Sequence, residues 1–340
     1  MKHGALIIAE MSANHNGDKS IAIETVRAAK RAGADAIKLQ TYTADTITLD
    51  CNNEDFQIKQ GTLWDGQTLY NLYQQAYTPW EWHQEIFDEA NRLGLLCFST
   101  PFDKTAVDFL ETLDNPIYKI ASFEITDIPL IEYAASKMKP MVISTGIAQI
   151  EDIELAIEAC HRVGNNDITL LKCTSSYPAP IEEANLCMIK EMAERFGVKT
   201  GLSDHTIGSI APIVAITQGA TMIEKHFILD RSVGGPDAAF SMNEQEFTQM
   251  VKDVRAAELS LGKAFYQLTP KQQANRHFAR SLYIAADIKK GDTITADNVR
   301  SVRPGLSLHP KYYKQIIGKK TLIDLKKGDR LNLTNIQMDV

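Results

Sequence analysis

The sequence lacks the features of a membrane protein, a secreted disulfide framework or a nucleic-acid-binding protein. No apolar run approaches the roughly 20 residues of a membrane-spanning helix, and the short apolar stretch near the N-terminus soon turns polar, unlike a secretory signal. The five cysteines are widely spaced without a CxxC pair, which indicates free thiols in a reducing compartment. There is no long run of Lys and Arg, and the net charge is −7. We therefore expect a cytoplasmic protein without membrane or nucleic-acid partners, and a small anion as a ligand.

The composition is ordinary for a folded protein. Of the 340 residues, 44% are hydrophobic and 23% are charged, which excludes extended disorder. The chain is longer than one usual core requires, so a large domain with a smaller appendage is expected. Cys97 and Cys173 lie inside apolar strand-like runs and are interpreted as small core residues.

Short apolar runs alternate with amphipathic stretches as far as about residue 260. Eight runs are typical of strands: Ala5–Met11, Ala36–Gln40, Leu95–Thr100, Ile117–Ser122, Met141–Thr145, Ile168–Cys173, Thr200–Asp204 and Met222–His226. Helical patterns lie between or after them: Ser20–Ala32, Pro79–Leu93, Thr105–Leu113, Ile150–Val163, Ile181–Phe196 and Asn243–Leu261. Eight such units predict a (β/α)8 TIM barrel over residues 1–262, of the α/β class.

Two regions depart from this pattern. The connection from Tyr42 to Tyr77 is too long for an ordinary loop, so we expect a lid or a wall of the substrate site. After a linker at 263–280, residues 281–340 contain short strands and turns. There the phrase Asp-(Ile/Leu)-Lys-Lys-Gly-Asp occurs twice, at 287–292 and 324–329, which predicts a small β-rich domain with internal pseudo-symmetry.

Two histidines end neighbouring predicted strands. In a TIM barrel the active site lies at the carboxyl ends of the strands, so His205 and His226 would emerge side by side. Neutral histidine nitrogens can hold one divalent metal there, and Mn, Mg, Co or Zn would all be tolerated. The alternative is that each is a buried histidine bonded to the backbone.

Lysines and carboxylates accompany the histidines at the strand ends. Lys38 and Lys119 sit within strands, where a buried cation needs an anionic partner. With the serines and threonines of neighbouring strand ends, they predict a pocket for a phosphate or carboxylate. Glu10 and Glu124 are candidate catalytic carboxylates, Glu124 as a general acid or base.

Several long motifs carry a resemblance to a known family. The phrases are IIAEMSANHNG, AIKLQTYT, STPFD, YKIASFE, STGIA, LKCTSSYP, GLSDHT, EKHF and GGPDAAFSMN, with FARSLY and SVRPG in the tail. Together they closely resemble the sialic acid synthase family over nearly the whole chain. The resemblance implies a transferase that uses a divalent metal, Mn or Mg or Co, to condense phosphoenolpyruvate with an open-chain amino sugar.

The resemblance also implies roles for individual residues. The positions matched to phosphoenolpyruvate binding are Lys38, Thr100, Lys119, Ser122, Ser144, Ser175 and Ser203. Those matched to the metal are His205 and His226, and those matched to the sugar are Gln40, Tyr177 and Asp237, with Glu10 and Glu124 as catalytic carboxylates. The tail resembles the antifreeze-like, or SAF, domain. The resemblance implies a domain-swapped homodimer in which Arg303 reaches the sugar bound by the partner.

The implied reaction is an aldol-like condensation with C–O cleavage, in which the metal polarises the C1 aldehyde of the sugar. Segments between Glu54 and His83 most resemble the members that use 2,4-diacetamido-2,4,6-trideoxy-L-altrose and make pseudaminic acid. Three alternatives remain: precursors of legionaminate or N-acetylneuraminate as the sugar, a metal-dependent aldolase that uses pyruvate, and a non-catalytic scaffold with a binding module in its tail.

Overall fold

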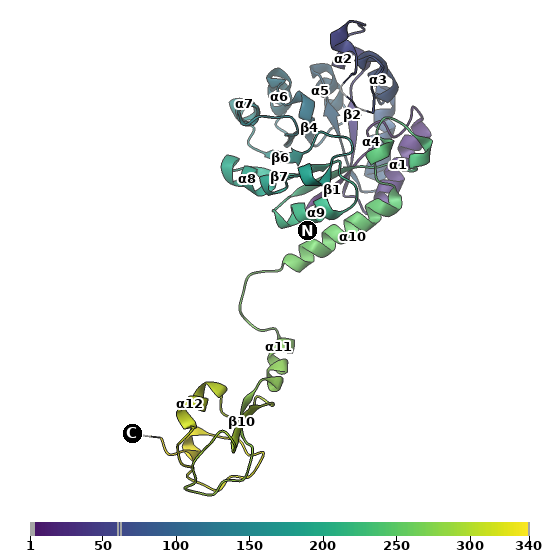
Figure 1. Cartoon of the computed structure of the whole chain (residues 1–340). Coiled ribbons are helices and arrows are strands. Elements are labelled where there is room, and N and C mark those ends of the chain that lie inside the picture. The colour runs from purple at the N-terminus through teal and green to yellow at the C-terminus, as the bar shows by residue number, and fades with distance from the viewer. Residues whose placement is uncertain (1–3, 60, 62, 339–340) are drawn as a thin grey trace. The chain divides into compact units, whose positions relative to one another are not determined.

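The chain divides into two compact units, Met1–Gly262 and Lys263–Val340 (Figure 1). The computed structural model describes residues 4–59, 61 and 63–338. Within these residues, no helix has both the length and the apolar character that crossing a bilayer requires.

The first unit is built on a closed parallel barrel of eight strands. Its strands are β1 (Leu6–Glu10), β2 (Ala36–Thr41), β3 (Leu96–Pro101), β4 (Tyr118–Ile120), β5 (Met141–Ser144), β6 (Ile168–Cys173), β7 (Lys199–Asp204) and β8 (Met222–His226). Each pairs with its neighbour in sequence order, and β1 also pairs with β8, which closes the ring. The predicted TIM barrel is confirmed.

Helices surround the barrel and bury apolar faces against its outer side. They are α1 (Lys19–Arg31), α4 (His83–Arg92), α5 (Lys104–Glu111), α6 (Ile128–Ala135), α7 (Ile150–Arg162), α8 (Cys187–Phe196), α9 (Ile210–Thr217) and α10 (Glu244–Leu261), with α2 (Ala44–Ile47) and α3 (Leu69–Ala76) inside the long connection after β2. Local chemistry sets their ends. Asp103, for example, accepts hydrogen bonds from the backbone N–H groups of Thr105 and Ala106 at the start of α5.

Two predicted elements differ from the structure, and one helix of the structure has no predicted counterpart. The helix predicted from Ile181 begins only at Cys187, because Asn185 adopts a left-handed conformation with φ of 44°. The fourth strand ends at Ile120 rather than Ser122, and a 3₁₀ turn, Ser122–Glu124, follows it. Helix α6 has no counterpart in the prediction, since its sequence IPLIEYAA is too uniformly apolar to show a helical period.

The barrel interior changes from apolar to polar along the strands. Its lower layer is an apolar cluster: Ile8, Ala36, Phe98, Ile117, Val142 and Leu171, with Met222 packed against it. Strand side chains alternate between faces, so the residues two positions further along also point inward. They are Glu10, Lys38, Thr100, Lys119, Ser144, Cys173, Ser203 and Glu224. A polar layer therefore lies directly on the apolar layer, at the carboxyl ends of the strands.

The second unit begins with an exposed segment, residues 263–280, that contains α11 (Pro270–Asn275). Strands β9 (Ser281–Ile284) and β10 (Val299–Val302) then pair antiparallel, and α12 (Tyr313–Ile316) follows. The two repeated phrases bond to each other reciprocally. Lys290 N donates to Asp324 Oδ1 at 2.7 Å, and Lys327 N donates to Asp287 Oδ1 at 2.8 Å. The pseudo-symmetry predicted from the repeat is present.

Candidate active site

Lys38 is the centre of a buried ionic cluster at the barrel mouth. Its Nζ lies 2.9 Å from Glu10 Oε2 and 3.5 Å from Glu224 Oε1, and it donates to Thr100 Oγ1 at 3.1 Å. Ser203 Oγ donates to the same Glu224 oxygen at 3.1 Å. Burial would lower the pKa of Lys38, but the two carboxylates outweigh it and raise that pKa. Lys38 therefore stays charged and already has anionic partners within the protein.

Lys119, unlike Lys38, has only hydroxyl and carbonyl groups as partners. Its side chain is also buried, and its Nζ donates to Ser144 Oγ at 2.6 Å and to the Ile120 carbonyl at 3.0 Å. Among the residues that the structure describes, no carboxylate lies within 4.0 Å of this ammonium group. Burial accordingly lowers the pKa of Lys119. A buried ammonium that no carboxylate contacts is suited to receive an anionic ligand.

A small cradle lies beside Lys119, between the ends of β4, β5 and β6. Gly146 N donates to Ser122 Oγ at 3.1 Å. A Cβ atom at position 146 would come within 2.0 Å of Ser175 Oγ, 2.7 Å of Ser122 Oγ and 3.2 Å of Cys173 Sγ. Glycine at this position therefore lets two hydroxyls and a thiol pack directly against the backbone, and these groups line the cradle.

Cys97 and Cys173 are both buried, as the interpretation as small core residues predicts, and Cys173 also belongs to this cradle. The inward position of Cys173 on β6 places its Sγ 3.8 Å from both Ser175 Oγ and His205 Nδ1. Burial alone would raise the pKa of the Cys173 thiol, but His205, Ser122 and Lys119 together lower it to about 7.

The two histidines face each other across the ends of β7 and β8. The ring centroids of His205 and His226 are 5.3 Å apart. His205 Nδ1 is engaged by the Thr174 carbonyl at 3.1 Å, so in part it is a histidine bonded to the backbone, and its Nε2 is the nitrogen left for a ligand. His226 Nδ1 is buried without a hydrogen-bond partner, 4.0 Å from Asp237 Oδ2.

The histidine pair fits a divalent cation. Burial and the neighbouring His205 hold the pKa of His226 well below its usual value, so its ring is neutral and its lone pairs are available. In the described residues, no group of three or more His, Cys, Asp or Glu side chains is arranged to hold a metal ion. The protein would then supply two nitrogens, and oxygen atoms of substrate or water would complete the coordination.

Two carboxyl groups near the mouth have pKa values raised by burial. Burial raises the pKa of Glu10 to about 7 against the opposing effect of Lys38, and Gln40 Nε2 donates to Glu10 Oε1 at 3.1 Å. Burial also raises the pKa of Glu124 to about 7, and its Oε2 is buried without a hydrogen-bond partner. Such a group can both give and take a proton near neutral pH.

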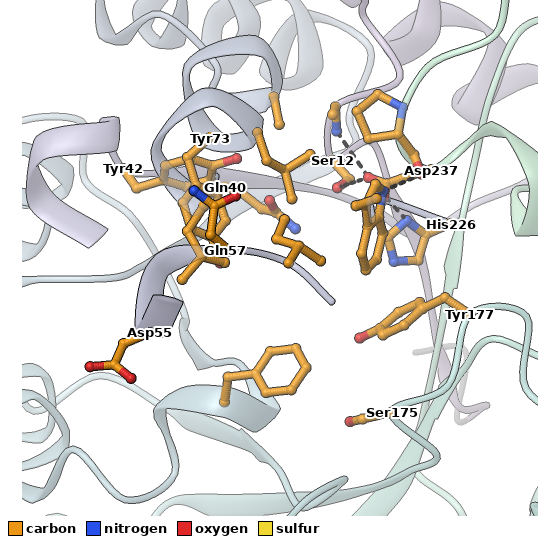
Figure 2. A pocket seen from close by; sticks show the side chains of 18 residues that line it. Ser12, Gln40, Tyr42, Asp55, Gln57, Tyr73, Ser175, Tyr177, His226 and Asp237 are labelled. Atoms are coloured by element: carbon orange, nitrogen blue, oxygen red, sulfur yellow. Dashed lines mark hydrogen bonds and ion pairs between the residues drawn. The ribbon is translucent and has the colours of Figure 1, made fainter. Parts of the chain in front are cut away.

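A cavity of about 560 Å³ opens above these groups. Figure 2 shows Ser12, Asp237, His226 and Tyr177 on one side of it and Tyr42, Tyr73 and Gln57 on the other. Asp237 accepts a hydrogen bond from Ser12 and is held in a buried position. Gln40 and Ser175 also line the cavity, so four predicted sugar-side or anion-side residues meet at its wall.

The long connection after β2 forms the outer wall of this cavity. Its apolar lining residues are Ile58, Leu69, Leu72, Tyr73 and Ala76. The Trp64 indole donates to the Pro236 carbonyl at 3.1 Å and its ring lies 5.7 Å from that of Tyr177. The connection thus forms one wall of the cavity, and its role toward a substrate, as a wall or as a lid, stays a prediction.

Arg303 is the one predicted site residue outside the barrel unit. It lines a cleft of about 370 Å³ in the second unit together with Arg300 and Lys327. Its predicted contact with the sugar stays a prediction.

The prediction gave no role in the site to Glu224, Gly146 or Cys173. Glu224 could have been found, because it lies midway between the inward-facing Met222 and His226 on β8. The cradle around Gly146 could not, because it depends on how three loops meet.

Comparison with known proteins identifies the family of the chain and several of its relatives. Residues 25–266 match the NeuB family, and residues 279–336 match the SAF domain. The chain is 51% identical over 332 residues to a pseudaminic acid synthase of Helicobacter pylori, covering 97% of each chain. It is 49% identical over 331 residues to a pseudaminic acid synthase of Campylobacter jejuni serotype O:2, covering 97% of this chain and 96% of that one.

A solved structure is similar in fold over the full length. It is that of the spore coat polysaccharide biosynthesis protein spsE of Bacillus subtilis, with a TM-score of 0.66 and 30% sequence identity. The match covers 100% of this chain and 97% of that one.

Proposed function

The chain belongs to the NeuB family, and on that premise we propose that it condenses phosphoenolpyruvate with 2,4-diacetamido-2,4,6-trideoxy-L-altrose to give pseudaminic acid and phosphate. Two relatives at about 50% identity that carry the name pseudaminic acid synthase support this choice of product. The proposal makes the protein a transferase that forms a carbon–carbon bond.

The environment of Lys119 is the observation that supports an anionic substrate. This ammonium group is buried at the barrel mouth with hydroxyl and carbonyl partners only, and the cradle of Gly146 adds the hydroxyls of Ser122 and Ser175. Phosphoenolpyruvate offers both a phosphate and a carboxylate to such donors. Lys38 and the hydroxyls of Thr100, Ser122, Ser144, Ser175 and Ser203 complete its proposed binding site.

The residues of the chain then act mainly by positioning and by proton transfer. Held in the cradle, phosphoenolpyruvate presents C3 to the C1 aldehyde of the open-chain sugar, and the new bond leaves a cationic centre at C2. Water adds at C2 and gives a proton to the Glu124 carboxylate, and the resulting tetrahedral intermediate expels phosphate with cleavage of the C–O bond. Glu124, whose pKa lies near 7, delivers the proton that the aldehyde oxygen takes up.

His205 and His226 are the residues that would hold the divalent cation, and Mn, Mg and Co all suit two nitrogens with oxygen co-ligands. When bound there, a cation supplies Lewis-acid polarisation of the sugar carbonyl. Gln40, Tyr177 and Asp237, which line the same cavity, orient the polar groups of the sugar.

The two sides of the cavity match the two ends of this sugar. The polar side, with Ser12, Asp237 and His226, suits the aldehyde end and the acetamido groups. The opposite wall of Ile58, Leu69 and Leu72 is apolar and suits the C6 methyl group of a 6-deoxy sugar.

We further propose that the protein works as a homodimer in which the second unit of one chain completes the partner's site. The opposite net charges of the two units support this arrangement. Residues 263–340 contain 15 Lys and Arg against 6 Asp and Glu, a net charge of +9, whereas residues 1–262 contain 21 against 37, a net charge of −16. The exposed segment 263–280 gives the second unit the reach to leave its own barrel.

The experiment compares phosphate release from phosphoenolpyruvate with three sugars: 2,4-diacetamido-2,4,6-trideoxy-L-altrose and the precursors of legionaminate and N-acetylneuraminate. We expect kcat/KM to be highest, by at least about tenfold, with the altrose sugar, because a misplaced acetamido group or an added hydroxyl leaves polar groups unpaired. Equal or better turnover of another sugar would overturn the substrate assignment. Condensation with pyruvate in place of phosphoenolpyruvate would instead support an aldolase.

A further inference from the structure

A buried ion pair lies immediately behind the two histidines. Lys225 Nζ donates to Asp204 Oδ2 and to the Thr206 carbonyl, each at 2.5 Å. The two side chains are only 1% and 2% exposed. None of the steps above uses them.

The pair lies on the outer face of the barrel, away from substrate. Asp204 and Lys225 are paired in the strand register, next to the pair Ser203 and Glu224, whose side chains meet in the lumen. Since successive side chains of a strand point to opposite faces, the ion pair faces the surrounding helices. Lys225 therefore cannot contact an anion in the lumen.

The hydrogen bonds of this ion pair involve residues directly next to both histidines. Asp204 precedes His205, and its carboxylate also accepts from Thr206 N at 2.9 Å and from Thr206 Oγ1 at 3.1 Å. Lys225 precedes His226, and the register of β7 with β8 ends at this pair. The network thus ties the residues on both sides of His205 to the residue before His226.

We propose that the Asp204–Lys225 pair is a positioning element for the metal site, which holds the backbone of His205 and His226 at the separation that one divalent cation needs. This inference rests on the metal role given to the two histidines above. A buried ion pair contributes little net stability compared with an apolar pair of the same size, so fixing geometry is a better reason for its presence at this point.

Positioning and electrostatics predict opposite results when Lys225 is neutralised. Lys225 is next to His226 in the chain, so its positive charge would also repel a cation bound there. If charge alone mattered, Lys225→Met would tighten metal binding, all the more because the Asp204 carboxylate remains. If the pair positions the histidines, the same variant binds the metal more weakly.

The test titrates full-length protein with Mn(II) and measures the free ion by electron paramagnetic resonance, without substrate. We expect Lys225→Met to raise the Kd for Mn(II) by about 10- to 100-fold, the range found when a partner that orients a metal ligand is removed. Asp204→Asn, which keeps the shape and the contact with Thr206, gives a smaller change in the same direction. Lys225→Gln, which removes the charge but keeps a hydrogen-bond donor, serves if Lys225→Met does not fold.

The control breaks another ion pair of the same barrel. Asp35 bonds to Arg255 and to Ile7 N at the opposite end of the strands. Asp35→Asn should lower the thermal stability and leave the Kd for Mn(II) within about twofold of wild type.

Unchanged or tighter Mn(II) binding by both Asp204 and Lys225 variants would overturn the positioning role while leaving the proposed function intact. A wild-type protein that binds no Mn(II) would overturn the metal role itself, and this inference with it.

Discussion

Lys38 and Lys119 are two buried lysines of one barrel mouth, and their methionine variants should behave oppositely. Lys38 lies within 3.5 Å of two carboxylate groups, whereas Lys119 has only hydroxyl and carbonyl partners. Lys38→Met leaves Glu10 and Glu224 buried and unpaired, which costs about 3–5 kcal/mol of unfolding free energy. Lys119→Met removes a buried cation that no carboxylate contacts, so the unfolding free energy should change by less than about 1 kcal/mol.

Binding of phosphoenolpyruvate, in contrast to stability, should depend strongly on Lys119. Two unit charges 4 Å apart interact by about 4 kcal/mol at an effective dielectric constant of 20, and a hydrogen bond to a charged group contributes about 1.5–3 kcal/mol. We therefore expect Lys119→Met to weaken phosphoenolpyruvate binding by about 2–4 kcal/mol, or about 30- to 1000-fold.

Two assays separate these effects. Urea unfolding without ligand measures the stability of each variant, and the thermal shift caused by phosphoenolpyruvate measures binding without turnover. A loss of 3 kcal/mol or more in Lys119→Met would mean that Lys119 is a structural cation. A normal shift with phosphoenolpyruvate would refute its role in binding the anion.

Three further predictions follow from the geometry. Burial raises the pKa of Glu124 from 4.5 to about 7, so its neutral form stabilises the fold, fully below pH 4.5, and this contribution is lost as the pH rises through 7. Glu124→Gln should therefore stabilise the protein by about 2 kcal/mol more at pH 8 than at pH 5.5 in urea unfolding, and equal gains at both values would contradict this. Gly146→Ala displaces the Ser122 and Ser175 hydroxyls and should raise the KM for phosphoenolpyruvate at least about tenfold while the protein remains folded; an unchanged KM would remove the cradle from the site. Mixing Arg303→Ala with Lys119→Met, each inactive alone, should restore part of the activity if Arg303 acts on the partner's barrel, whereas a mixture as inactive as its components would argue against a shared site.

The sequence was sufficient for the barrel because each strand and most helices carry their own pattern. The inward polar layer follows from the two-residue period of the strands, which places Lys38 and Lys119 in the lumen. That same period would have indicated Glu224. It says nothing of which lysine is paired, because that depends on distances across the lumen between β1, β2, β4 and β8.

Features made by loops were beyond the sequence patterns. The left-handed Asn185 shortens α8, and the cradle at Gly146 needs the ends of β4, β5 and β6 in contact. The apolar wall from α3 could be predicted only as a long insertion, since its cavity-facing residues depend on tertiary packing.

The most direct measurement follows both products of the proposed reaction by mass spectrometry. Purified protein is incubated with Mn(II), 2,4-diacetamido-2,4,6-trideoxy-L-altrose and phosphoenolpyruvate that carries ¹⁸O in the bridge between C2 and phosphorus. Cleavage of the C–O bond predicts labelled phosphate and an unlabelled product with the mass of pseudaminic acid. Unlabelled phosphate, or no condensation product with this sugar, would contradict the proposed function.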